Sequence, residues 1–403
     1  MLVVSLHLAA VNCVPAQETI RMSLAGEAAA EARRKAVSAT DDCTVHLGPS
    51  SWTFGSALDV QANDNILFAS SEPEFDVIVS PQISTRMVWP FSERNNASLA
   101  VGTGYSAYVL HSEFNRMFVT PGSELSFDLY VGDFWIDLHE GLSITKNSYE
   151  DPTVVGIADY SQLQNSVGVT GTWDLNKIVV RLAYDHANYV MLHGEGGLPD
   201  GRSEILGLSA GYNWKPLTTF GVETGGGWIE YTGAGAPDER ARDWNIGTFV
   251  EAHPMEYVSL KASAGYTVYS PVSSAGSAFT GIYARLGLNH RLNRHLEYHL
   301  SGGRSISFGF YAGTIDLYSA NLDLRWHLFQ KLSLWTGFEF EHGSQVLIGH
   351  ETFDRFGPHL SLERQITAKM SGALRYQFYD RRSDVAGGDY TVNLVTLNIA
   401  YRL

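Results

Sequence analysis

The chain has 403 residues and a formal net charge of −15 at neutral pH, so it lacks the cationic excess that nucleic-acid binding requires. Gly (39) and Tyr (20) are abundant. The only two cysteines, Cys13 and Cys43, exclude a disulfide framework and a CxxC zinc pattern.

No uninterrupted apolar stretch reaches the roughly 18 to 20 residues that a membrane-spanning helix needs. A β-barrel crosses a bilayer with about 9 to 11 residues per strand, alternating apolar and polar side chains. Its average hydropathy is therefore unremarkable, and only the pattern along the chain reveals it.

The first fifty residues carry no strand pattern. Leu2 to Val11 is a short apolar run, and Val14-Pro15-Ala16 resembles a small-residue cleavage site, but no basic region precedes the run. Glu18 to Val37 is rich in Ala, Glu and Arg, which favour a helix. We expect residues 1–50 to form a signal-like segment and a periplasmic extension, and residues 51–403 to form the barrel.

From Ser51 onward, apolar and polar residues alternate with a period of two, the pattern of half-buried strands. The first run places Trp52, Phe54, Leu58 and Val60 on one face. Similar runs start near Phe75, Leu125, Ile178, Leu206, Val258, Leu322, Leu332 and Met370. About 18 segments are expected, within the usual boundary error of about two. We therefore predict an all-β, antiparallel, up-and-down transmembrane barrel.

The connections between these segments alternate in length. Short turns occupy Asp174–Lys177, Trp214–Thr218, His253–Tyr257, Leu292–His295 and Phe329–Lys331. Long connections are expected over Thr145–Ser161, Val190–Ser203, Thr232–Asp243, Ser270–Phe279 and Asp380–Tyr390. Short periplasmic turns and long external loops are the layout of outer-membrane barrels.

Three tryptophans, Trp89, Trp173 and Trp214, share the apolar parity and come just before short turns. Amphipathic rings favour the membrane–water interface, so we predict that these residues form a lipid-interface girdle at the periplasmic rim. The apolar face is thereby assigned to lipid, and the bacterial outer membrane is the expected location.

Three further patterns offer chemistry, and each has a simpler interpretation. Gly207–Gly211 matches GxSxG but lies mid-strand, without the strand-to-helix turn that a serine nucleophile needs. His295, Glu297 and His299 share one parity and suit a metal, although polar residues are expected on a lumen wall. Asn63-Asp64-Asn65 offers oxygen ligands for calcium, although Asn and Asp are common in turns.

Glu140 falls on the lipid-facing parity, where a charge is costly. A β-bulge, a protomer interface or a wrong register are all compatible with this position.

Charged residues of both signs occupy the opposite parity, and we predict that they line the pore. A barrel of roughly 16 to 18 strands is wide enough for a water-filled channel, although a salt-bridged filling would close it. The predicted pore-lining residues are Arg86, Asp128, Asp137, Arg181, Glu223, Glu251, Lys261, Arg285, Asp323, Arg325, Glu339, Glu363 and Arg375.

The run Asp59 to Phe68 (DVQANDNILF), followed by Val79-Ser80-Pro81, resembles the opening of β-barrel porins associated with exopolysaccharide loci. The strands from Leu374-Arg375-Tyr376 to the final Tyr401-Arg402-Leu403 are similar to that family's closing strands. This last strand also resembles the signal read by the barrel-assembly machinery, except that it ends in Leu403 rather than Phe. The resemblance implies an outer-membrane protein with polysaccharide passage and brings no catalytic residues.

Two functions therefore remain open: a porin-like channel for small or polysaccharide-related solutes, or a closed barrel that binds partners or surface polymers through external loops. We expect no enzymatic activity, no catalytic residue, no cofactor and no metal. The expected partners are outer-membrane lipid and the assembly machinery, and a homo-oligomer is left open.

Overall fold

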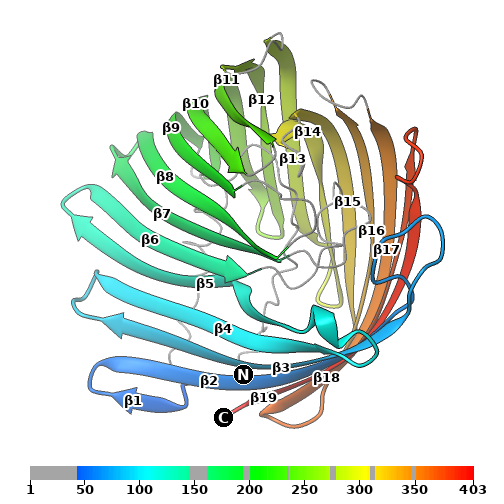
Figure 1. Cartoon of the computed structure of the whole chain (residues 1–403). Coiled ribbons are helices and arrows are strands. Elements are labelled where there is room, and N and C mark those ends of the chain that lie inside the picture. Colours follow the sequence, from blue (N-terminus) through cyan, green and yellow to red (C-terminus); the bar gives the residue numbers. More distant parts are fainter. Residues whose placement is uncertain are drawn as a thin grey trace.

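The computed structural model describes residues 43–144, 161–193, 200–215, 217–233, 236–272, 278–308, 314–345 and 351–403. Within these ranges the chain forms one antiparallel sheet that curls around and closes on itself (Figure 1). Each strand from β2 to β19 pairs with the next along the chain, and β19 pairs with β2 to complete the ring. This confirms the predicted closed up-and-down barrel of 18 strands.

The strands follow one another with almost no other regular structure. A single 3-10 turn, η2 (Ser112–Phe114), interrupts them in the described part of the chain. The strands are β1 (Val45–Leu47), β2 (Ser50–Asn63), β3 (Asp76–Pro90), β4 (Asn96–Tyr108), β5 (Arg116–Val131), β6 (Phe134–Ile144), β7 (Ser161–Asp174), β8 (Ile178–His193), β9 (Asp200–Lys215), β10 (Thr218–Gly233), β11 (Ala236–Met255), β12 (Val258–Pro271), β13 (Phe279–Arg291), β14 (Leu296–Phe308), β15 (Thr314–Phe329), β16 (Leu332–Gln345), β17 (Thr352–Gln365), β18 (Met370–Ser383) and β19 (Tyr390–Arg402).

The alternation of side chains decides which face of the sheet points outward. Leu182, Leu208 and Leu374 each share one parity with the other exposed large apolar residues of their strands, and this face forms the outside of the barrel. Successive side chains of a strand point to opposite faces, so the charged residues of the other parity point inward. An apolar exterior around a polar interior, in a sheet without free edges, is the arrangement that lipid requires of strands.

The described connections at one end of the barrel are short, as predicted, whereas residues 145–160, 194–199 and 273–277 of the predicted long connections lie outside the described residues. Tight turns join β7 to β8, β9 to β10, β13 to β14 and β15 to β16 at one end. One expected long loop is wrong, because β10 and β11 continue through Thr232–Asp243 in paired register almost to their tips. Beyond the apolar band, both faces of a hairpin can be polar, so no alternation marks this extension in the sequence.

The chain enters the barrel through a short strand that the sequence did not reveal. Val45 to Leu47 of β1 pair with Ser50 to Trp52 at the start of β2. The Thr44 hydroxyl donates a hydrogen bond to the carbonyl of Leu403, 2.8 Å away, so the entry of the barrel is tied to its last residue. No helix among the described residues is long and apolar enough to cross a membrane.

Candidate functional site: the lumen and its outer mouth

The connection between β2 and β3, residues 64–75, folds into the barrel and is called the first mouth segment. Its Phe68 packs on Tyr379, Tyr390, Val392 and Leu394, all of which are buried on the inner wall of β18 and β19. Ile66 packs in the same way on Ile78 and Tyr108. Inward apolar side chains would otherwise face water, so the segment covers the wall at the long-loop end of the lumen and narrows its mouth.

Polar side chains fix this segment in place. The Asn65 side chain donates to the carbonyls of Ala69 and Thr391 at 2.9 and 3.0 Å, and the Asp64 carboxylate accepts from the Asn393 amide at 2.7 Å. The Asn63 side chain accepts the backbone N–H of Asn65 at 2.9 Å, which closes a local turn. Asn63-Asp64-Asn65 is thus a polar turn that anchors the segment to β19.

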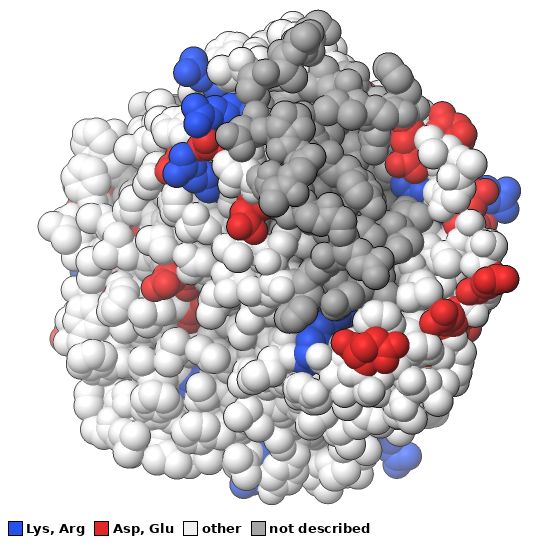
Figure 2. Space-filling model, in the orientation of Figure 1, with Lys and Arg blue, Asp and Glu red and all other residues white. Residues whose placement is uncertain are grey.

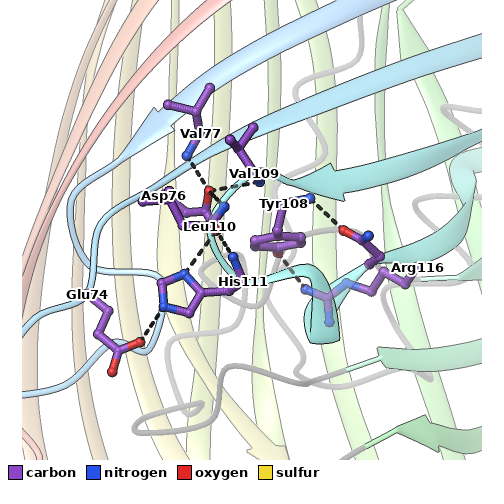
Figure 3. Close-up of polar contacts among 9 residues, drawn as sticks. Glu74, Asp76, Val77, Tyr108, Val109, Leu110, His111 and Arg116 are labelled. Carbon is purple, nitrogen blue, oxygen red and sulfur yellow. Dashed lines mark hydrogen bonds and ion pairs between the residues drawn. The ribbon is translucent and has the colours of Figure 1, made fainter.

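A second connection, residues 109–115 between β4 and β5, is held by one carboxylate and is called the second mouth segment. Asp76, which is fully buried, accepts the backbone N–H groups of Val109, Leu110 and His111 at 2.9 to 3.0 Å (Figure 3). It also accepts the Val77 N–H at 2.6 Å, and it contacts Nδ1 of His111 at 3.0 Å. A buried carboxylate satisfied by this many donors fixes the segment against β3.

His111 joins the two mouth segments. Its Nδ1 contacts Asp76, and its Nε2 lies 2.9 Å from a carboxylate oxygen of Glu74, in the first mouth segment (Figure 3). Both ring nitrogens donate only when the imidazole is protonated. The hydrogen bond to Asp76, with the nearby charge of Glu74, raises the pKa of His111 above its ordinary value.

The base of the second mouth segment is also pinned. The Asn115 side chain accepts the Tyr108 N–H at 2.7 Å, and the buried Arg116 donates to the Tyr108 hydroxyl at 3.0 Å. The ring of Phe114 packs edge-on against Tyr108. The segment therefore rests on the inner wall through both polar and apolar contacts.

Two buried arginines lie on the inner wall beside the first mouth segment. Arg355 on β17 is 2% exposed; it pairs with Glu341 and Glu339 on β16 and stacks on Tyr379. Arg381 on β18 stacks on Phe353 and pairs with Glu351 at 2.8 Å. Because Tyr379 belongs to the same buried cluster as Phe68, the charged pairs of Arg355 adjoin the apolar contacts of the first mouth segment.

Deeper in the lumen, polar side chains on non-adjacent strands contact each other along the inner wall, over glycines of the strands between them. His139 on β6 contacts Asp185 on β8 at 2.8 Å, and a Cβ at Gly168 on β7, between them, would clash with both. His359 and Asp323 meet in the same way over Gly337. The Tyr283 hydroxyl donates to Glu223 at 2.8 Å, over Gly247 and Gly265. These contacts satisfy the polar groups without bringing them together across the centre of the barrel.

The predicted pore-lining residues all lie on strands, on the parity opposite to the exposed apolar residues. The sheet register brings some of them together. Glu251 stands directly opposite Lys261, and Arg181 reaches the same Glu251 carboxylate from β8, each at 4.0 Å. Asp128 and Asp137 also lie directly opposite each other and are separately satisfied by Trp135 and His139. Arg86, Arg285, Arg325, Glu339, Glu363 and Arg375 are distributed around the circumference.

The exposure of these side chains differs with their depth. Arg181, Lys261 and Glu251 keep 32%, 40% and 22% of their side-chain surface exposed, whereas Arg355 near the mouth is almost fully buried. Side chains that fill a closed core lose their contact with water, so these inward charges border solvent-accessible space.

The three predicted girdle residues lie on the outward face at the end with short turns. Trp89, Trp173 and Trp214 are 44%, 40% and 61% exposed. Trp173 stacks on Phe134 with 5.2 Å between ring centroids, and the two residues are direct cross-strand neighbours. This position is the one expected of aromatic side chains at a bilayer rim.

The remaining motifs take ordinary places in the sheet. Gly207–Gly211 lies in regular register with β8 and β10, so Ser209 has no nucleophile turn around it. Glu297 contacts His327 at 3.2 Å, while His299 contacts Asn289 at 2.6 Å, so Glu297 and His299 have separate partners, as polar residues of a lumen wall do. No group of three metal-ligating side chains is found in the described part of the chain.

Glu140 keeps its lipid-facing parity, because β6 pairs with β7 in unbroken register from Phe134 to Ile144. The nearby irregularity lies on β5, between Val119 and Ser123. The Asn165 side chain lies 3.5 Å from the Glu140 carboxylate. The structure therefore contradicts a wrong register and a bulge within β6 as explanations of this charge.

Comparisons with known proteins support the fold. No family model matches the chain, and no curated protein matches it. Among solved structures, OpdQ of Pseudomonas aeruginosa is 8% identical, with a TM-score of 0.51 over 89% of this chain and 99% of that one. A BenF-like porin of Pseudomonas fluorescens Pf-5 is 9% identical (TM-score 0.50, 89% and 100%). OccK2 (OpdF) of P. aeruginosa, solved with glucuronate, is 12% identical (TM-score 0.50, 88% and 98%).

The chain thus has the fold of outer-membrane porins. An even number of antiparallel strands, a closed ring and an apolar exterior are the properties of barrels in the bacterial outer membrane, and the protein sits there.

Proposed function

We propose that this barrel is a channel for small polar solutes across the outer membrane. The observation that carries the proposal is the partial exposure of inward charges such as Arg181, Glu251 and Lys261. A closed structural barrel would bury these groups in a salt-bridged filling, at a large desolvation cost.

The hydrogen bonding along the inner wall supports the same function. Contacts between non-adjacent strands, such as Glu223–Tyr283 and Asp323–His359, keep polar groups close to the wall. The solute path is therefore lined by polar groups that are already hydrogen-bonded.

The balance of charge suggests how selective the channel is. Inward residues of both signs occur around the lumen, as in the pair Lys261–Glu251. A lumen with both signs gives no strong field of a single sign, so we propose neutral or weakly charged solutes rather than polyanions or polycations. The mouth segments limit the size of these solutes.

Saccharides related to surface polysaccharides are the finer form of this proposal. It rests on the resemblance of Asp59–Phe68 and of the final strands to porins of exopolysaccharide loci. Glucuronate is a suitable test solute, because OccK2, a barrel of the same fold, was solved with it.

Planar bilayer recording tests the proposal. Stable conductance steps are expected from the purified barrel, and the double variant R325E/R375E should shift the reversal potential toward cations. R382E is the matched control, because Arg382 is 75% exposed and pairs with Asp380 on the outward face. A silent bilayer would support the closed interaction barrel instead, and an unchanged reversal potential would remove Arg325 and Arg375 from the conducting path.

A further inference from the structure

A cluster of arginines occupies the outside of the barrel at the long-loop ends of β9, β10 and β11. Arg202 on β9 and Arg240 on β11 both stand directly opposite Glu230 on β10 and share its carboxylate. Arg242 follows on β11, opposite Trp228. In Figure 2 cationic side chains gather at the upper left, over the ends of these strands.

The parity of these residues places them on the lipid side. Arg202 and Glu204 share the outward face of β9 with Leu206, Leu208 and Trp214, all of which are highly exposed. Arg202 and Arg240 keep 62% and 60% of their side-chain surface exposed. They therefore present their guanidinium groups to whatever surrounds the barrel, and not to the solute path.

The height of the cluster follows from strand geometry. Arg202 is twelve residues from Trp214 on the same strand. With about 3.3 Å per residue and a tilt of about 40°, it lies about 30 Å above that tryptophan. The apolar band of such barrels is about 25 Å tall, so the arginines stand just beyond its outer edge.

The aromatic residues below the cluster mark the same depth. Trp228 and Trp244 are 57% and 48% exposed on the outward face, and Trp228 lies directly opposite Glu204 and Arg242. Exposed tryptophans of this kind lie at the headgroup level of a bilayer. Two independent markers thus place the arginines beside lipid headgroups.

We propose that this cluster binds the phosphate groups of a phosphorylated glycolipid in the outer leaflet. The cluster holds three arginines, Arg202, Arg240 and Arg242, and two carboxylates, Glu204 and Glu230, and Asp200 lies at its edge on the outward face of β9. Glu230 holds two guanidinium groups side by side, with Arg202 donating through Nε at 2.8 Å and Arg240 through Nε at 2.8 Å. Guanidinium groups held in this way are ready to donate paired hydrogen bonds to phosphate oxygens.

The experiment is native mass spectrometry of the whole barrel in mild detergent, titrated with bisphosphorylated lipid A. Lipid A treated with phosphatase, phosphatidylglycerol and inorganic phosphate are the comparison probes. We expect a retained lipid A adduct, and R202Q/R240Q/R242Q should retain it about tenfold less. The control R382Q removes an exposed arginine from the outward end of β18 and should retain it fully.

Folding of each variant is checked by its heat-dependent migration on gels, and the single variants R240Q and R242Q replace the triple variant if it does not fold. Equal retention by wild type and arginine variants would overturn the proposal. Dephosphorylated lipid A or phosphatidylglycerol binding as well as bisphosphorylated lipid A would also overturn the proposal. Binding of inorganic phosphate without binding of lipid A would have the same consequence. Oligomers that dissociate in the arginine variants would instead assign the cluster to a second copy of the chain. All these outcomes are independent of the conductance of the lumen.

Discussion

Replacing Asp76 by alanine should release the second mouth segment while leaving the barrel closed. The carboxylate accepts four backbone N–H groups and contacts the His111 ring, and three of those N–H groups belong to residues 109–111. Alanine removes this acceptor from the N–H groups of Leu110 and His111, whereas the Val109 N–H keeps the Val77 carbonyl at 3.1 Å. A hydrogen bond to a charged group contributes about 1.5 to 3 kcal/mol, and such contributions are not additive within one network.

We expect the local opening free energy of residues 109–115 to fall by about 3 kcal/mol, since at least two charged hydrogen bonds are lost at once. This corresponds to roughly a hundredfold faster amide exchange, because 1.4 kcal/mol is about a factor of ten. Hydrogen–deuterium exchange with peptide-level mass spectrometry measures this directly. D76N should give an intermediate result, because its amide oxygen still accepts.

D174A is the matched control, because Asp174 accepts the Asn176 N–H in a short turn at the opposite end of the barrel. It should leave the exchange of residues 109–115 unchanged. If D76A and wild type exchange at the same rate in this segment, the carboxylate does not hold it, and the account of the mouth is wrong.

Three further predictions concern the mouth, the wall and the lipid face. The pKa of His111 is raised, so its link to Glu74 is fully present at acidic pH and is lost as the pH rises through that raised pKa. The current noise of the channel should therefore increase over that pH range, and H111Q should abolish this pH dependence. In thermal melts, G168V should lower the unfolding free energy by about 1 to 3 kcal/mol, because its side chain displaces the His139–Asp185 contact. The control G171A should have little effect, because its added methyl group meets only the Leu182 carbonyl at 4.0 Å. E140L should raise the denaturant midpoint in liposomes, because it removes a charge from the lipid face; a lower midpoint, or a loss of oligomers, would assign Glu140 to a protomer contact.

The barrel itself could be predicted because alternation is forced by lipid on one side and water on the other. Each strand from Trp52 onward repeats the same requirement, so local errors do not change the overall count. The outward tryptophans could be predicted for the same reason, since Trp89, Trp173 and Trp214 combine parity with a neighbouring turn.

The mouth could not be predicted in the same way, because its contacts join residues far apart in sequence. Phe68 packs on Tyr379 and Val392, and Asp76 holds residues 109–111. One signal was present: the apolar run Ile66-Leu67-Phe68 is unusual for an exposed loop, and it indicates a segment that folds against apolar side chains.

The buried pairs of the wall were missed for another reason. His139 and Asp185 share the inward parity, as do Asp323 and His359, but parity does not give the relative heights of strands that lie two apart. The glycines between such pairs, among them Gly168 and Gly337, were the available clue, because a glycine within a strand often marks a close approach.

Site-selective tryptophan quenching tests the central claim, that one parity faces lipid and the other faces water. Single-tryptophan variants that keep Trp173 or Trp214 should be quenched by brominated lipids and should resist aqueous iodide. Variants that keep Trp335, which stacks under Arg325 on the inner wall, should show the reverse. Lipid quenching of Trp335, or protection of Trp173 and Trp214 from brominated lipids, would contradict the account.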